Sequence, residues 1–236
     1  MKRTLFMVSV IAAVVLGAVL SCGAADDMAA FVKSNIQWLG HDTFRIAGDR
    51  TVYIDPFKIK KADKADIILI THDHFDHCSG ADVKKLLGPK TVVVTPGGGC
   101  KGFRADERIV KPGDRLEVGG IAIEVVPSYN VKKDFHPKDK GYAGYIITVK
   151  GKRIYHAGDT DHIPEMKTFK NIDIALLPVS GTYVMTADEA RAAALEIKPR
   201  IAIPMHYGDI VGTRGDAERF AEGLKGKVEV IILEKQ

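Results

Sequence analysis

The stretch Thr71-His72-Asp73-His74-Phe75-Asp76-His77 carries the strongest signal for the fold, because it places three imidazoles and two carboxylates within seven residues. It follows a mostly apolar run that ends at Ile70 and is typical of a buried strand. Side chains two positions apart lie on one side of an extended backbone, whereas they diverge on a helix. His72 and His74 can therefore face one metal ion, while the next turn directs Asp76 and His77 toward a second. The spacing predicts a metal-binding loop at a strand end.

Two later apolar runs end in similar polar residues. One closes with His156-Ala157-Gly158-Asp159-Thr160, and the other closes with Pro204-Met205-His206. Because binding sites of α/β proteins usually lie at the carboxyl ends of buried strands, we expect Asp159 and His206 to approach the first loop.

Together, the motifs His72-x-His74-x-Asp76-His77, Gly158-Asp159-Thr160 and Pro204-Met205-His206 resemble the metallo-β-lactamase superfamily. Within it, the resemblance is to metal-dependent hydrolases that include lactonases acting on phosphorylated sugar acids. The segments 38–44 (Trp-Leu-Gly-His-Asp-Thr-Phe) and 53–56 (Tyr-Ile-Asp-Pro) also resemble that group and the related phospholipase D enzymes that cleave N-acyl phosphatidylethanolamine. The resemblance covers about residues 35 to 235. It implies an α/β fold, a single-domain, four-layer αββα sandwich.

The resemblance also implies a binuclear metal site. One ion would be held by His72, His74 and a third histidine, the second ion by Asp76, His77 and His206, and Asp159 would bridge the two. Zinc is the default for imidazole and carboxylate ligands, but manganese, iron or nickel would accept the same set.

The third histidine of the first ion is an open question. The superfamily usually supplies it as Ala-x-His at a strand end, where this chain has Pro127-Ser128-Tyr129-Asn130. Either His136 reaches in from the following loop, or the first ion is held by two histidines, Asp159 and solvent.

Five further residues are expected beside the metals or the substrate. Asp55 is placed to accept a hydrogen bond from a ligand imidazole, although a plain turn aspartate is the alternative. His41 and His156 either contact the site or are structural histidines. Thr182 and Tyr183 are positioned to hydrogen-bond substrate.

These features predict metal-assisted hydrolysis, with a metal-bound hydroxide attacking an ester, lactone or phosphodiester of a small molecule. Asp76 and Asp159 are the expected catalytic carboxylates, and Asp76 would pass a proton to the leaving group. Nearby loop lysines favour an anionic substrate, or else form a solvated charged surface: Lys132, Lys133, Lys138 and Lys140. The alternative functions are a non-catalytic, surface-tethered metal- or ligand-binding protein and a β-lactamase.

Length and charge narrow the choice of fold and partner. An amidohydrolase-type (β/α)₈ barrel also uses a His-x-His pair, but it needs ~250 residues, and this chain has 236 with few helix signals. The clearest helix begins at the capping box Thr186-x-x-Glu189, and shorter signals predict helices over 83–87 and 216–224. A formal net charge of +4 does not indicate the strongly basic surface that nucleic-acid binding requires.

The N-terminus has the form of a secretory leader, because Lys2-Arg3 precede a mostly apolar run that ends Val19-Leu20-Ser21-Cys22. This ending resembles the bacterial lipobox, which implies acylation of Cys22. We expect a signal peptide over 1–21, a tether over 22–31 and a hydrolase domain over 32–236, exported and lipid-anchored to the membrane of a bacterial-type cell envelope. An uncleaved signal anchor or a secreted form is the alternative. Export permits a disulfide between Cys78 and Cys100, with free buried thiols as the alternative.

Overall fold

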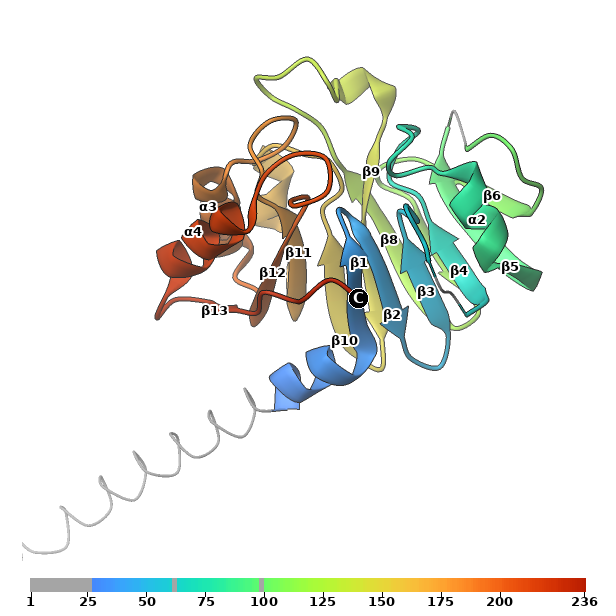
Figure 1. Cartoon of the computed structure of the whole chain (residues 1–236), viewed down its shortest axis with the longest axis horizontal. Helices are drawn as coiled ribbons and strands as arrows, with labels where there is room; N and C mark the ends of the chain where they lie inside the picture. The colour runs from blue at the N-terminus through green and yellow to red at the C-terminus, as the bar shows by residue number, and fades with distance from the viewer. Residues whose placement is uncertain (1–26, 61–62, 98–99) are drawn as a thin grey trace, which may run out of the picture.

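Two β-sheets face each other in the computed structural model, which describes residues 27–60, 63–97 and 100–236 (Figure 1). The first sheet has six strands in sequence order: β1 (Ile36–Gly40), β2 (Thr43–Ala47), β3 (Thr51–Ile54), β4 (Ala65–Leu69), β5 (Leu87–Pro96) and β6 (Asp106–Val110). The second has seven, in the order β13 to β7: β7 (Arg115–Val118), β8 (Ile121–Pro127), β9 (Ala143–Val149), β10 (Lys152–His156), β11 (Ile174–Pro178), β12 (Ile201–Met205) and β13 (Glu229–Val230).

Three helices cover the outer faces of the sheets, so the expected αββα sandwich is confirmed (Figure 1). They are α2 (Gly80–Leu86) on the first sheet, and α3 (Ala187–Ile197) and α4 (Arg214–Leu224) on the second. The predicted capping box begins α3, since the Thr186 side chain accepts from the amide of Glu189 and the Glu189 carboxylate accepts from the amide of Thr186. Two short 3₁₀ turns connect strands: Lys138–Lys140 and Pro164–Thr168.

The first sheet separates two apolar cores because its side chains alternate between its faces. Ile67 and Leu69 of β4 pack between the sheets with residues such as Ile147, while Ile68 packs outward against Leu86 of α2. This alternation fixes the register of β4, since a shift of one residue would turn its apolar side chains to the wrong face. The loop that follows β4 is thereby set at one edge of the sandwich.

Parallel pairing directs several loops to the same edge of each sheet. β3 and β4 are parallel, and so are β10, β11 and β12. The loops that leave these strands carry most of the polar residues singled out above, so the fold brings them together at the strand ends.

The segment before β1 differs from its expected role. Residues 27–35 are helical, and Met28 and Val32 are buried in the core. The described part of the expected tether therefore packs on the domain, which extends at least to Asp27. The signal peptide and Cys22 lie outside the described residues. Within the described ranges, none of the helices has the length and apolar character needed to cross a bilayer.

Candidate metal centre

The seven predicted metal ligands converge at the strand ends, although they come from four separate loops. The loop after β4 carries His72, His74, Asp76 and His77, and the β8–β9 connection carries His136. Asp159 follows β10, and His206 follows β12. Six of them belong to overlapping groups in which the ligand atoms lie within 4.8 Å of one another. The seventh, Asp76, is connected to these groups by its hydrogen bond with His41.

The first group consists of His72, His74 and His136. His74 Nδ1 lies 3.1 Å from His72 Nε2 and 3.3 Å from His136 Nε2. Neutral imidazole nitrogens at this separation repel one another unless a proton or a cation lies between them, because each non-protonated nitrogen carries a lone pair. Three imidazole donors are a common ligand set for zinc, so this group fits a divalent metal.

His136 reaches into the site from the loop after Asn130 and lies beside His72 and His74. His136 is 1% exposed, and Asn130 Oδ1 accepts from both His136 N (3.0 Å) and His136 Nδ1 (3.1 Å). Asn130 is itself held, since its Nδ2 donates to Tyr183 O at 2.9 Å. These bonds leave the His136 Nε2 lone pair facing the group. Burial lowers the pKa of His136 to about 4, which keeps the ring neutral and able to bind a cation at neutral pH.

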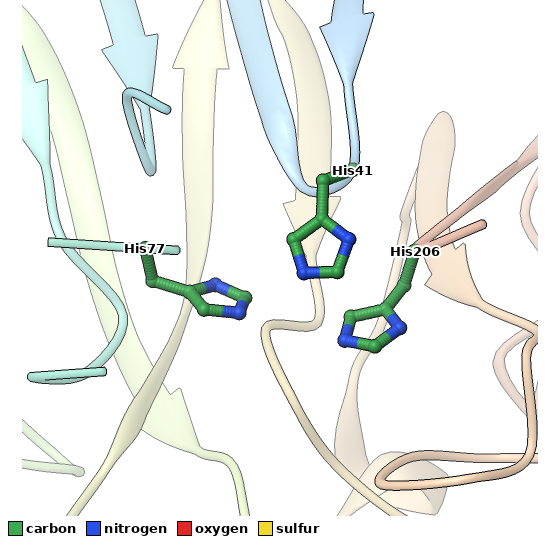
Figure 2. Close-up of side chains that lie close together, drawn as sticks. All are labelled: His41, His77 and His206. Atoms are coloured by element: carbon green, nitrogen blue, oxygen red, sulfur yellow. The ribbon is translucent and has the colours of Figure 1, made fainter. Parts of the chain in front are cut away.

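The second group consists of His41, His77 and His206, whose rings point toward a common centre (Figure 2). His77 Nδ1 donates to Asp55 Oδ2 at 2.8 Å, as expected, and this bond orients the ring so that Nε2 faces the centre. His77 Nε2 is buried and has no hydrogen-bond partner among the described residues. His206 Nδ1 is bonded to Ser180 Oγ at 2.8 Å, so its Nε2 also faces the centre.

Asp159 connects the two groups through one carboxylate oxygen. Its Oδ2 lies 3.2 Å from His206 Nε2, 3.3 Å from His136 Nε2 and 3.5 Å from His77 Nε2. Burial opposes ionisation of this carboxyl, but the surrounding histidines, His206 foremost, lower its pKa well below its ordinary value. A buried carboxylate in contact with imidazoles of both groups has the position that a bridging ligand requires.

Asp76 lies at the solvent side of the second group. Its side chain is 15% exposed, and His41 Nε2 donates to its Oδ2 at 3.1 Å. Burial opposes the ionised form, but the hydrogen bond from His41 and the charge of His77 outweigh it and lower the pKa of Asp76. The carboxylate is therefore ionised at neutral pH and able to accept a proton.

Asp42 is a candidate ligand that the sequence analysis missed. It is fully buried, and both of its carboxylate oxygens lack hydrogen-bond partners in the described part of the chain. One oxygen belongs to a group with His77, Asp159 and His206. Burial and the nearby Asp159 raise the pKa of Asp42 well above its ordinary value, a cost that a bound cation would offset. The available signal was a polar His41-Asp42 pair in a tight turn between two apolar strands.

The backbone around the centre is strained at three ligand or support residues. His41, Asp55 and His206 have positive φ angles of 51°, 44° and 60°. Such angles are uncommon outside glycine and concentrate at functional sites, where packing and hydrogen bonds sustain them. The His206 amide donates to the carbonyl of His41 at 3.1 Å, so two of these residues hold each other in place.

The remaining predicted residues differ in their roles. Both ring nitrogens of His156 bond backbone groups, Asp42 O at 2.9 Å and Gly158 N at 3.2 Å, so His156 supports the loops rather than contacting substrate. Thr182 is exposed, whereas Tyr183 is half-buried and packs against Phe135.

Two of the four loop lysines are already paired with carboxylates. Lys133 binds the buried Asp161, and Lys138 Nζ lies 2.9 Å from Glu165 Oε1. The loop is therefore less cationic than its sequence suggests, which removes part of the support for an anionic substrate.

Cys78 and Cys100 form a disulfide, with their Cα atoms 5.3 Å apart. This separation lies within the range that an unforced disulfide needs. Because Cys78 directly follows His77, the bond ties the ligand loop to a neighbouring loop of the first sheet.

Comparisons with known proteins agree with this geometry. A family described as Beta-lactamase superfamily domain matches residues 35–206. A UPF0173 metal-dependent hydrolase of Pyrococcus abyssi is 33% identical over 214 residues, covering 84% of this chain and 95% of that protein. A solved structure of a candidate metal-dependent hydrolase from Parabacteroides distasonis is 34% identical, with a TM-score of 0.74 and coverage of 85% of this chain and 93% of that chain.

A second solved structure, from Thermotoga maritima, is described as a candidate Zn-dependent hydrolase of the metallo-beta-lactamase superfamily. It shares the fold with a TM-score of 0.62 at 22% identity, covering 85% of this chain and 98% of that chain. From its motifs, its fold and these relatives, the chain belongs to the metallo-β-lactamase superfamily.

Proposed function

We propose that this protein is a hydrolase that uses two divalent metal ions, zinc by default, to cleave an ester, lactone or phosphodiester of a small molecule. The observation that carries the proposal is the position of Asp159, whose Oδ2 lies within 3.5 Å of Nε2 of His136, His77 and His206. Relatives described as metal-dependent hydrolases support the same reaction class.

The orphaned polar atoms of the centre fit such ions. His77 Nε2, Asp159 Oδ1 and both oxygens of Asp42 are buried without hydrogen-bond partners in the described ranges. Buried polar groups are rarely left unpaired, because each one costs free energy unless something replaces its hydration. Divalent ions at these atoms would supply Lewis acidity and would lower the pKa of a water toward neutrality.

The protein's own groups have separate tasks in this proposal. His72, His74 and His136 would hold one ion, and Asp76, His77 and His206 the other, with Asp159 between them. Asp55 orients His77 through the 2.8 Å bond to Nδ1.

Asp76 would orient the attacking water and carry a proton to the leaving group, because it is ionised and, unlike the buried Asp159, is partly exposed to solvent. Its partner His41 is neutral, since burial lowers the pKa of that ring, and it donates the hydrogen bond that holds the carboxylate in place. A protein that only stored metal would need no carboxylate with this partial exposure.

Turnover of matched substrate panels tests the proposed function. The metal-loaded domain should hydrolyse members of at least one panel of esters, lactones or phosphodiesters. Asp76→Asn, assayed at a metal concentration that saturates the centre, should lower kcat by about 10²-fold or more, since a positioned acid or base contributes that much. Metal-loaded protein that hydrolyses none of these panels, or an Asp76→Asn variant with full activity, would contradict the proposal.

We further propose that the protein is exported and held at the membrane by acylation of Cys22. The leader-like run before Cys22 supports this, and the Cys78–Cys100 disulfide fits an oxidising compartment. Mass spectrometry of the mature N-terminus should find a diacyl or triacyl Cys22. An intact Met1 or an unmodified terminus would contradict it.

A further inference from the structure

Exposed apolar side chains gather on the loops of the metal centre. The described residues contain five large hydrophobic side chains that are exposed, and four lie on loops that carry predicted ligands: Phe75 (70% exposed), Val131 (55%), Phe135 (50%) and Ile210 (41%). The fifth, Ile109 (61%), lies on β6, away from those loops. Single exposed apolar residues are normal on a protein surface, but a concentration beside a binding site indicates contact with an apolar ligand.

Two aromatic pairs lie on or beside the loops of the metal centre, and the Phe57 ring of one pair lies 6.2 Å from the His41 ring. Phe75 packs edge-on against Phe57, with ring centroids 5.9 Å apart, and Phe135 packs edge-on against Tyr183 at 4.6 Å. We call these four residues the aromatic rim. Phe75 directly follows His74, and Phe135 directly precedes His136, while the rings of His74 and His136 lie only 5.0 Å apart. Each pair is thus adjacent in the chain to a ligand of the same group.

The loop that carries Phe135 is held in place by buried polar groups. Asp161 is 3% exposed, and its Oδ2 accepts from the amides of Val131 at 2.9 Å and Lys132 at 3.3 Å. Asp161 also binds Lys133. These bonds fix the backbone in a conformation that leaves Val131 and Phe135 in water. The exposure of Phe135 is therefore a feature of an ordered loop.

We propose that the aromatic rim binds the hydrocarbon part of the substrate, an unbranched acyl or alkyl chain attached to the bond that is cleaved. The inference rests on the proposed function, because it assigns the scissile group to the metals. Phe75 and Phe135 adjoin His74 and His136 in the chain and are exposed, so a hydrocarbon chain that extends toward solvent from a group held at these histidines can contact both rings. Apolar contact is favoured over charge, since Lys133 and Lys138 are paired with carboxylates.

Binding of alkyl hydroxamates tests this without relying on turnover. Hydroxamates bind metals through two oxygens, and a series from acetohydroxamate to octanohydroxamate changes only the chain length. Calorimetric titration of the metal-loaded protein should show affinity rising by about two- to fourfold per added CH₂, the upper value corresponding to full burial. The double variant Phe75→Ser/Phe135→Ser should lose most of this increase while binding acetohydroxamate within about twofold of wild type.

Ile109→Ser is the matched control, because it removes an equally exposed apolar side chain from β6. It should keep the full dependence on chain length. A wild-type affinity that does not rise with chain length, or a rise that the double variant retains, would overturn the inference and leave the proposed function intact.

Two further outcomes have separate meanings. If even acetohydroxamate does not bind to protein that contains metal, the proposed function fails and the inference falls with it. If the double variant keeps the increase of hydroxamate affinity with chain length but loses binding to phosphatidylglycerol vesicles, the exposed aromatics contact a membrane and the inference is wrong.

Discussion

Replacing Asp55 with asparagine separates the charge of this residue from its shape. Asp55 accepts three hydrogen bonds in the structure: from the Thr71 amide (2.8 Å), from Thr71 Oγ1 (2.6 Å) and from His77 Nδ1 (2.8 Å). In Asp55→Asn, the side-chain oxygen can still accept the hydrogen bond from the backbone amide of Thr71. The NH₂ group would then face His77 Nδ1, which is itself a donor in the metal-binding tautomer. The variant therefore favours the wrong tautomer of His77.

The expected cost follows from that bond. Loss of a carboxylate that orients a metal-binding histidine typically lowers metal affinity 10- to 100-fold, or about 1.4 to 2.7 kcal/mol. Loss of the charged hydrogen bond should also lower the free energy of unfolding of the metal-free protein by about 2 kcal/mol. The ion at His77 should be affected more strongly, because Asp55 bonds to His77 directly but reaches His72 of the first group only through Thr71 Oγ1, which lies 2.9 Å from His72 Nδ1.

Calorimetric metal titration in the presence of a competing chelator measures both affinities. Asp49→Asn, the same substitution in the exposed turn between β2 and β3, is the control and should leave both unchanged. Binding of both ions by Asp55→Asn within twofold of wild type, or an equal fall in both affinities, would contradict the proposed role of Asp55.

Three other predictions follow from neighbouring contacts. His136→Ala should lower metal affinity at least tenfold, whereas the same change at His162, which binds Glu196 at the surface, should not; equal metal titrations for both would exclude His136 as a ligand. Because the pKa of His136 falls from 6.5 unfolded to about 4 folded, the unfolded state binds the proton first. The free energy of unfolding of the metal-free protein should therefore fall by up to about 3 kcal/mol as the pH is lowered from 6.5 to 4. Urea titrations of His136→Asn should show a smaller fall over the same pH range. The double variant Cys78→Ser/Cys100→Ser should lose about 3 kcal/mol of unfolding free energy, from the chain entropy of a 22-residue separation; unchanged urea midpoints against oxidised wild type would contradict this.

The strands that form the interior of the sandwich could be predicted from the sequence, and so could the edge strands β1 and β13, whereas the edge strands β6 and β7 could not. β4 and β11 are nearly all apolar because both faces of each strand are covered. β6 and β7 lie at the edges of the two sheets and carry mostly exposed side chains. Their sequences therefore have no apolar pattern to indicate a strand, and neither was predicted.

Site residues that occur together in a sequence motif could be predicted. Residues that are distant in sequence and are brought together only by the fold were missed. The histidines of the ligand loop are close in sequence, so their spacing alone indicates a shared ion. Asp42 lies in the turn between β1 and β2, at one edge of the first sheet. Nothing in its local sequence shows that its side chain lies near Asp159. His41 was expected beside the metals, but not as a member of the group with His77 and His206.

Charge was the least predictable property of the site. Four lysines in the loop after Asn130 suggested attraction of anions, but the partners of Lys133 and Lys138 come from Asp161 and Glu165, in the connection after β10. Sequence shows how many charges a loop carries, whereas only the folded chain shows which are already paired.

Metal stoichiometry tests the central claim most directly. Purified mature protein, dialysed and then loaded with zinc, should hold two ions per chain by elemental analysis. The double variant His72→Ala/His74→Ala should hold at most one, because it removes two of the three imidazoles of the first group and leaves the second group intact. A wild-type protein that binds no zinc on titration, or a double variant with the same zinc content as wild type, would contradict the account.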